Sequence, residues 1–229
     1  MRAKYAAIRT MIVMLVLLCA MAMRCPATLL TDNFPGSGAN LDLSKWTVQA
    51  TSGGANGIYH PSPGVLYVVG AWAGGGPGTF AVETSVPTFQ PTGGRDITLD
   101  VPVLTVADTY VGFFNATEVS SIAFRSDQGA NWAVETPSQL FNTSIPVNFG
   151  GPQDLSIDWS TSSVKFSING VSAATLSYTA TTALPMFVAD LTSGQDTSIS
   201  SVLVSETPEP GTLALLSFGA AVLAWYRRH

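Results

Sequence analysis

The chain has 229 residues, of which 46% are hydrophobic and 11% charged, with a formal net charge of −5 at pH 7. Four basic and fourteen acidic residues lie between Thr28 and Glu206, a net charge of −10 that would repel a phosphate backbone and excludes nucleic acid as a partner. With 11 Phe, 5 Trp and 6 Tyr the chain can bury a core, which excludes a disordered protein.

The N-terminal segment is typical of a secretory signal peptide. Three basic residues precede an apolar run at positions 11–23. A helix of this length spans about 20 Å, less than the roughly 30 Å hydrocarbon core, so we expect cleavage rather than a permanent anchor. Small residues allow cleavage after Ala22 or after Ala27, and we prefer Ala27 because strand-like sequence begins at Leu29.

Both cysteines of the chain, Cys19 and Cys25, lie within or beside the segment that we expect to be removed. The mature domain then has no disulfide, no cysteine nucleophile and no thiolate metal site. The stability of this exported domain must come from its core. We therefore expect a signal peptide at 1–27, one domain at 28–206 and a C-terminal tail at 207–229.

The central region shows the pattern of an all-β domain. Short apolar or alternating segments recur about every ten residues and are separated by Gly, Pro, Ser and Asn. The expected strands include 45–49, 65–69, 79–83, 96–101, 109–114, 121–125, 131–135 and 198–204. In 96–101, Ile97, Leu99 and Val101 share one face, and no segment from 28 to 206 has a helical apolar period. The sequence predicts a two-sheet antiparallel sandwich.

A three-stranded meander is expected from 154 to 178. The first two strands alternate apolar and polar residues, and Asn169-Gly170 supplies the positive φ angles of a tight hairpin turn. We expect Trp159 on the buried face and Asp158 opposite Lys165 on the solvent face.

This meander and the segments 32–34 (Asp-Asn-Phe) and 41–46 resemble concanavalin A-like jelly-roll sandwiches, such as laminin-G domains and glucanases. The resemblance covers nearly all of residues 28–206 and implies two antiparallel sheets. Members of that fold include lectins, enzymes and adhesive modules, so the resemblance alone assigns no activity.

The C-terminus combines Thr207-Pro208-Glu209-Pro210 with an apolar segment at 213–226 and the basic pair Arg227-Arg228. This arrangement resembles the PEP-CTERM sorting tail of Gram-negative surface proteins, in which valine is usual where Thr207 stands. The resemblance implies that an exosortase recognises Pro208, Glu209 and Pro210 and cleaves near them. It also implies that 213–226 inserts into the membrane and that Arg227 and Arg228 retain it there.

Simple physical properties agree with this interpretation of the tail. Prolines on both sides of Glu209 are expected to prevent helix formation and sheet pairing, which leaves an extended segment that a protease can bind. Fourteen apolar residues span about 21 Å, a marginal membrane span, and the terminal arginines hold the end on the cytoplasmic side. An ordinary tail anchor is the alternative.

Catalytic chemistry is sparse in the central region. His60 is its single histidine, which excludes a zinc site with several imidazoles, and no Gly-x-Ser-x-Gly motif is present. Laminarinase-like glycosidases carry Glu-x-Asp-x-(x)-Glu on one strand, because two carboxylates must flank the scissile bond. None of Glu83, Glu118, Glu135 and Glu206 has such partners at alternating positions. We expect no enzymatic activity.

Two ligand hypotheses remain. Tyr59, His60, Tyr67 and Trp72 lie near glycine-rich segments, and their rings could stack on sugars, although packing at the sandwich edge is the alternative for Tyr67 and Trp72. Asp32, Asn33, Asp190 and Asp196 could bind a structural calcium ion, but they form no cluster with calcium-loop spacing. No other cofactor is expected.

Two functions are compatible with the sequence. The first is a non-catalytic protein of the cell surface or extracellular matrix, exported and sorted through its tail, whose sandwich coats the cell or binds extracellular polysaccharide. The second is a secreted glycan-active hydrolase with a divergent site.

Overall fold

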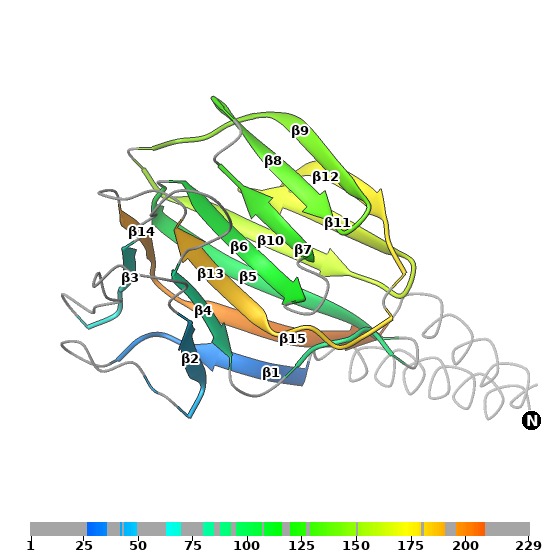
Figure 1. Cartoon of the computed structure of the whole chain (residues 1–229), viewed down its shortest axis with the longest axis horizontal. Coiled ribbons are helices and arrows are strands. Elements are labelled where there is room, and N and C mark those ends of the chain that lie inside the picture. The colour runs from blue at the N-terminus through cyan, green and yellow to red at the C-terminus, as the bar shows by residue number, and fades with distance from the viewer. Residues whose placement is uncertain are drawn as a thin grey trace, which may run out of the picture.

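The computed structural model describes residues 27–35, 42, 44–49, 63–69, 80–84, 88–92, 95–106, 108–115, 120–126, 129–149, 151–179, 181–190 and 196–208 (Figure 1). These residues form fifteen strands and no helix. The strands are β1 (Ala27–Asp32), β2 (Trp46–Gln49), β3 (Leu66–Val69), β4 (Phe80–Thr84), β5 (Arg95–Thr105), β6 (Thr109–Asn115), β7 (Ser120–Arg125), β8 (Asn131–Thr136), β9 (Gln139–Pro146), β10 (Gln153–Trp159), β11 (Ser163–Ile168), β12 (Val171–Ser177), β13 (Met186–Asp190), β14 (Asp196–Ile199) and β15 (Val202–Pro208).

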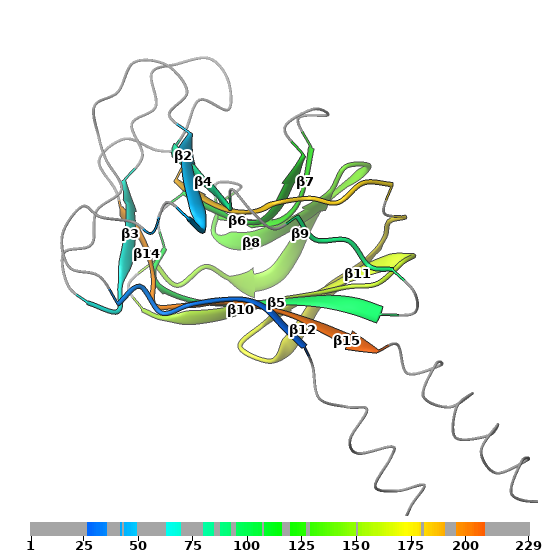
Figure 2. The same ribbon diagram turned by 90° about the horizontal axis from the view of Figure 1, so that it is seen from below.

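The strands form two antiparallel sheets that lie face to face as two layers (Figure 2). The eight-stranded sheet has the order β1-β15-β5-β10-β11-β12, and β14 joins β3 to β5. The seven-stranded sheet has the order β2-β4-β13-β6-β7-β8-β9. Strands distant in sequence, such as β13 and β6, are therefore neighbours. The expected two-sheet all-β sandwich is confirmed; the expected terminal helices lie outside the described residues.

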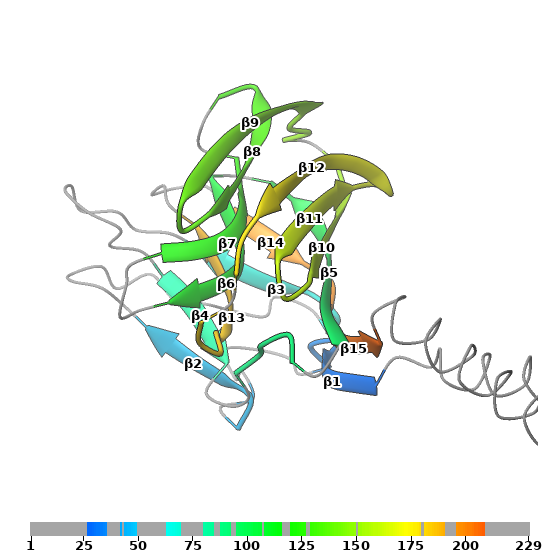
Figure 3. The same cartoon turned by 90° about the vertical axis from the view of Figure 1, so that its right-hand side faces the viewer.

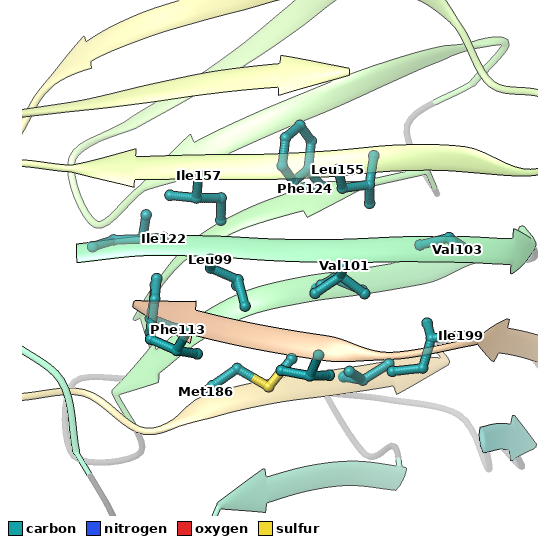
Figure 4. Close-up of a cluster of buried hydrophobic side chains, with 14 of the residues drawn as sticks. Leu99, Val101, Val103, Phe113, Ile122, Phe124, Leu155, Ile157, Met186 and Ile199 are labelled. Atoms are coloured by element: carbon teal, nitrogen blue, oxygen red, sulfur yellow. The ribbon is translucent and has the colours of Figure 1, made fainter. Parts of the chain in front are cut away.

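One core fills the space between the sheets (Figure 4). Leu99 and Val101 of β5 and Ile157 of β10 point from the eight-stranded sheet, and Phe113 of β6 and Met186 of β13 from the other. All five side chains are buried, because alternate residues of each strand point to the same face. The period of two in the sequence thus selects the residues that meet between the sheets.

The meander is confirmed, because β10, β11 and β12 pair in that order. β10 pairs with β11 so that Asp158 faces Lys165 and Trp159 faces Val164. Trp159 is fully buried and Lys165 is exposed, as expected, whereas Asp158 is half-buried. Asn169 and Gly170 have φ angles of 51° and 73°, the left-handed conformation that the tight turn requires. Asp158 also accepts a hydrogen bond of 3.0 Å from Thr98 Oγ1 of the neighbouring β5.

The structure corrects the expected single strand at 198–204. The chain breaks into β14 and β15, and both halves pair with β5. A register shift lies between Ser198 and Ile199, and the backbone N–H of Ser200 donates to the carbonyl of Pro102 at 3.1 Å. The bend lets β14 reach β3 while β15 continues along β5.

Two further strands carry little alternating signal in the sequence. All five residues of β13 are buried, so its sequence shows an apolar run without alternation. β9 is an edge strand with mostly exposed residues. In both cases the position of the strand within its sheet, rather than the local sequence, determines the burial pattern.

Candidate functional site

The aromatic residues proposed as sugar ligands are only partly covered by the structure. Tyr67 lies half-buried in β3, where it pairs in register with Ser198 of β14. Tyr59, His60 and Trp72 lie outside the described residues. Their proposed proximity to Tyr67 therefore stays a prediction.

Of the four candidate calcium ligands, Asn33 is exposed, the side chain of Asp196 lies outside the described residues, and Asp32 and Asp190 accept internal hydrogen bonds. Asp32 accepts from the Phe34 backbone N–H at 2.9 Å and from Trp46 Nε1 at 2.8 Å. Asp190, fully buried, accepts from the backbone N–H of Thr197 at 3.0 Å.

Asp32 and Asp190 also belong to different sheets, because β1 lies in the eight-stranded sheet and β13 in the seven-stranded sheet. Within the described part of the chain, no group of three or more His, Cys, Asp or Glu could hold a metal ion. Asp32 therefore links β1 to Trp46 of β2, and Asp190 links β13 to Thr197 of β14.

A polar and aromatic network covers the outer face of the seven-stranded sheet, the face turned away from the core. Side chains at alternate positions on β6, β7, β8 and β13 form it: Tyr110, Phe114, Ser121, Arg125, Glu135 and Phe187. These strands lie side by side at the middle of the sheet (Figures 1 and 3). The sheet therefore brings together residues from four separate segments.

Glu135 is the centre of this network. One carboxylate oxygen contacts the hydroxyl groups of Tyr110 and Ser121, and the other accepts from Arg125 Nη1 at 3.0 Å. The guanidinium carbon of Arg125 also lies 5.1 Å from the centre of the Tyr110 ring. Ser121 and Arg125 stand on either side of Ala123 on β7, so the Tyr110 ring extends across Ala123.

Burial changes the protonation of this carboxyl group. The side chain of Glu135 is 13% exposed, and loss of water around the carboxylate raises its pKa from 4.5 to about 7. The pair with Arg125 is an opposing influence, because a nearby positive charge favours the ionised form. Desolvation is the dominant cause here.

Aromatic rings close the face beside this polar group. Phe187 packs edge-on against Tyr110 with ring centres 5.0 Å apart and lies 5.4 Å from Phe114. Phe187 and Ala189 are each only 2% exposed although both point away from the main core. These residues form a second, smaller apolar cluster that leaves no exposed ring at Phe187 for a sugar to stack on.

Gly112 occupies a position on this face that admits no side chain. A Cβ atom there would lie 2.0 Å from the carbonyl oxygen of Ile122 and 2.7 Å from the Cα of Ala123 on β7. Real Cβ atoms do not approach backbone atoms so closely. Gly112 therefore permits the close approach of β6 and β7, between Tyr110 and Phe114.

The network provides one carboxyl group but no pair of carboxylates. Among the described outward side chains of β6, β7, β8 and β13, Glu135 is the single acid. Its oxygens are engaged by Tyr110, Ser121 and Arg125. Glycoside hydrolysis by the common mechanisms needs two carboxyl groups about 5 to 9.5 Å apart. The described face does not supply this arrangement.

Sequence reasoning considered Glu135 only for carboxylates on its own strand and missed the network. The polar residues do occupy alternate positions in three strands that were expected, at 109–114, 121–125 and 131–135. That alternation is the available signal. These residues can be recognised as one cluster only when the order of the strands in the sheet is known.

The first residue of the sorting motif belongs to the sheet. β15 continues to Pro208, which pairs in register with Arg95 of β5. The expectation that the prolines prevent sheet pairing is therefore wrong for Pro208; proline is compatible with a strand terminus. Beside it, Glu206 forms an ion pair of 2.8 Å with Arg95. Glu209, Pro210, Arg227 and Arg228 lie outside the described residues.

The first strand of the structure, β1, pairs with the last strand, β15. Ala27, the first residue of β1, pairs in register with Glu206. Among the described residues, no helix is long and apolar enough to span a membrane. The two apolar segments of the sequence, 11–23 and 213–226, are not among those residues.

Residues 206–228 match the PEP-CTERM protein-sorting motif. A comparison with curated proteins gives no match. Among solved structures, an endo-1,3-beta-glucanase from Streptomyces sioyaensis is similar over 80% of this chain and 97% of its own, with 14% identity and a TM-score of 0.55.

Two other solved structures are similar to the same extent. An endo-acting O-glycanase of the human gut microbiota matches 78% of this chain and 98% of its own, with 11% identity and a TM-score of 0.56. A Mycobacterium tuberculosis protein described as an immunostimulatory antigen and pseudo beta-1,3-glucanase matches 78% and 98%, with 13% identity and a TM-score of 0.53. At these identities the likeness shows the fold. The chain thus combines a jelly-roll β-sandwich similar to glucanase-like proteins with a C-terminal PEP-CTERM sorting motif, which indicates export and sorting to the cell surface.

Proposed function

We propose that this chain is a non-catalytic protein of the cell surface or extracellular matrix of a Gram-negative-type bacterium. It passes through an inner-membrane intermediate, held by residues 213–226 with Arg227 and Arg228. An exosortase-type enzyme then recognises Pro208, Glu209 and Pro210 and releases the sandwich. The match of residues 206–228 to the sorting motif supports this route.

The observation that carries the non-catalytic part is the outer face of the seven-stranded sheet. Its single described acid, Glu135, is held by Arg125, Tyr110 and Ser121, and the buried ring of Phe187 fills the adjoining surface. Among the described side chains of β6, β7, β8 and β13, a sugar chain would find neither a second carboxylate nor an exposed aromatic ring. Glu83 of β4 pairs in register with Phe187, and its side chain lies outside the described part of the structure. The similar fold of a protein described as a pseudo beta-1,3-glucanase is compatible with this interpretation.

Carbohydrate binding without hydrolysis is the finer part of the proposal. Tyr59, His60, Tyr67 and Trp72 supply the candidate stacking groups, and the acidic domain favours a neutral polysaccharide over an anionic one. Structural neighbours whose names describe action on glucans and O-glycans support a glycan as ligand.

A hydrolase is the second candidate, and one observation favours it. The pKa of Glu135, about 7, lies in the range that suits a general acid at neutral pH. The two functions are separated by assaying the exported, processed protein on beta-1,3-glucan and on mucin for new reducing ends, with Glu135→Gln as the matched variant. We expect no activity in either protein; release of reducing ends that the variant abolishes would establish the hydrolase.

Glycan binding is measured separately, on a glycan array. We expect a neutral glycan to bind the wild-type protein and binding to fall about two- to tenfold in Tyr67→Ala, the range of one stacking contact. An array without any bound glycan would contradict carbohydrate binding and leave the sorting route unaffected.

The sorting route is tested with Glu209→Ala. We expect the variant to fold but to stay at full length in the inner membrane, because the motif is no longer recognised. Thr207→Val is the matched control, since it restores the usual residue of this motif and should be processed. Cell fractionation and mass spectrometry of the C-terminus provide the measurement. An unchanged surface product from Glu209→Ala would refute the sorting role of the motif.

A further inference from the structure

β9 is the outermost strand of the seven-stranded sheet, and β8 is its one partner among the described strands. Two consecutive large apolar residues, Leu140 and Phe141, are 52% and 46% exposed on it. Phe149, just after the strand, is 49% exposed. Three of the six exposed large apolar side chains of the described residues thus lie on or near this edge.

β12, the edge strand of the eight-stranded sheet, lies on the same side of the sandwich as β9. β12 lies close to β9 at this side, whereas β1 and β2 lie at the opposite side (Figures 1 and 3). Val171, the first residue of β12, is 60% exposed. The open side therefore presents apolar groups from both sheets.

The opposite edge shows how this protein protects a free strand. β1 contains a register shift between Thr28 and Leu30, and Lys45 Nζ donates to the carbonyl of Thr31 at 3.4 Å. Irregular pairing and lysine are two devices that prevent edge strands from pairing with other chains. On β9 the pairing with β8 shifts register between Asn142 and Pro146, but it is regular from Gln139 to Asn142, and the strand holds no charged residue.

The charge distribution indicates what can approach this edge. Residues 28–206 carry a net charge of −10, so two copies repel each other over most of their surfaces. The stretches 136–153 and 166–189, which contain β9 and β12, have no Asp, Glu, Lys or Arg. A second copy of the same acidic chain can therefore approach at this edge without placing like charges opposite each other. A strongly basic partner would gain nothing at this position.

We propose that two copies of this protein associate through antiparallel pairing of β9 with the β9 of the second copy. The pairing makes one continuous sheet across a twofold axis and covers Leu140 and Phe141 of both copies. An isologous contact of this kind satisfies the free backbone groups of both edges at once. It would link sandwiches in pairs at the cell surface, whichever ligand they bind.

Sedimentation velocity of the exported, processed protein tests the proposal. We expect a dimer whose dissociation constant rises by more than about 100-fold in Phe141→Lys, because the twofold axis places two lysines in the contact. Asn142→Lys, at an exposed position, adds the charge without removing an apolar group and should act similarly. Leu203→Lys is the matched control, since Leu203 is 37% exposed on β15, away from β9, and should leave the dimer intact.

A cysteine crosslink provides the second measurement. In a Cys25→Ser background, cysteines placed singly at Leu140, Phe141 and Asn142 should give a disulfide-linked dimer in at least one case, whereas Leu203→Cys should not. A wild-type protein that stays monomeric at its solubility limit overturns the proposal, because β9 then does not pair with the β9 of a second copy. A dimer that dissociates in Leu203→Lys, or that survives both β9 lysines, also overturns it.

Discussion

Replacing Glu135 with Gln should abolish one pH-dependent contribution to the stability of the sandwich. The carboxyl group is buried and its pKa is about 7 in the folded chain, against an ordinary value of 4.5. The folded protein therefore binds this proton more tightly than the unfolded chain does. As pH rises from 4.5 to about 7, the free energy of unfolding falls, because ionisation favours the unfolded state.

The size of the effect follows from the two pKa values. Each pH unit between them is worth about 1.4 kcal/mol, so wild type should lose about 3 kcal/mol across this window from Glu135 alone. Gln is neutral at every pH, keeps the shape of the protonated acid and can still accept from Tyr110 and Ser121. The variant should match wild type near pH 4.5 and exceed it by about 3 kcal/mol above pH 7.

Urea unfolding of both proteins, followed by tryptophan fluorescence at a series of pH values from about 4 to 8, measures the difference. Subtracting the variant from wild type removes the contributions of the other carboxylates. Asp42→Asn is a control, because hydrogen bonds from Ser44 lower the pKa of Asp42 below 3.8; its contribution is complete before the series begins, so its difference from wild type should stay constant across the series. If wild type instead gained stability over Glu135→Gln between pH 4.5 and 7, the pair with Arg125 would outweigh burial and this reasoning would fail.

Two further predictions concern packing and are tested by denaturant titration. Trp159→Ala should lower the free energy of unfolding by about 3–5 kcal/mol, because it empties a fully buried site. Asp158→Ala loses the hydrogen bond from Thr98 and should lower it by about 1 kcal/mol or less. A larger loss for Asp158→Ala than for Trp159→Ala would contradict the register. Gly112→Ala should lower the free energy of unfolding by at least about 2 kcal/mol, since the new Cβ would lie 2.0 Å from the carbonyl oxygen of Ile122. In Gly151→Ala the new Cβ meets mainly the Asn148 side chain, so the loss should be smaller. Equal losses would refute the close approach of β6 and β7.

Local patterns predicted a large part of the fold. The alternation of Ile97, Leu99 and Val101 was enough to identify β5 and its buried face, and Asn169-Gly170 was enough to place the turn of the meander. These features depend on residues close in sequence. The break at Ser200 and the strand β13 were missed because each depends on pairing with distant partners.

The candidate site depends even more on contacts between residues that are distant in the sequence. Tyr110, Ser121 and Glu135 each occupy an alternate position in an expected strand, but the sequence analysis assigned none of them to a face. Nothing local indicates that β6, β7 and β8 are adjacent, that Phe187 of the distant β13 packs against Tyr110, or that burial raises the pKa of Glu135.

The sequence by itself determined the all-β class, the meander and the sorting motif, since each depends on the order of residues along a short segment. The tertiary structure alone decided the strand order, the network around Glu135, the inclusion of Pro208 in β15 and the free edge at β9. Antiparallel sheets bring residues together by register and strand order, and the cost of closing the intervening loops changes little with their length. Short-range patterns therefore identify strands and their faces, while neighbours across a sheet are set by the packing of the whole domain.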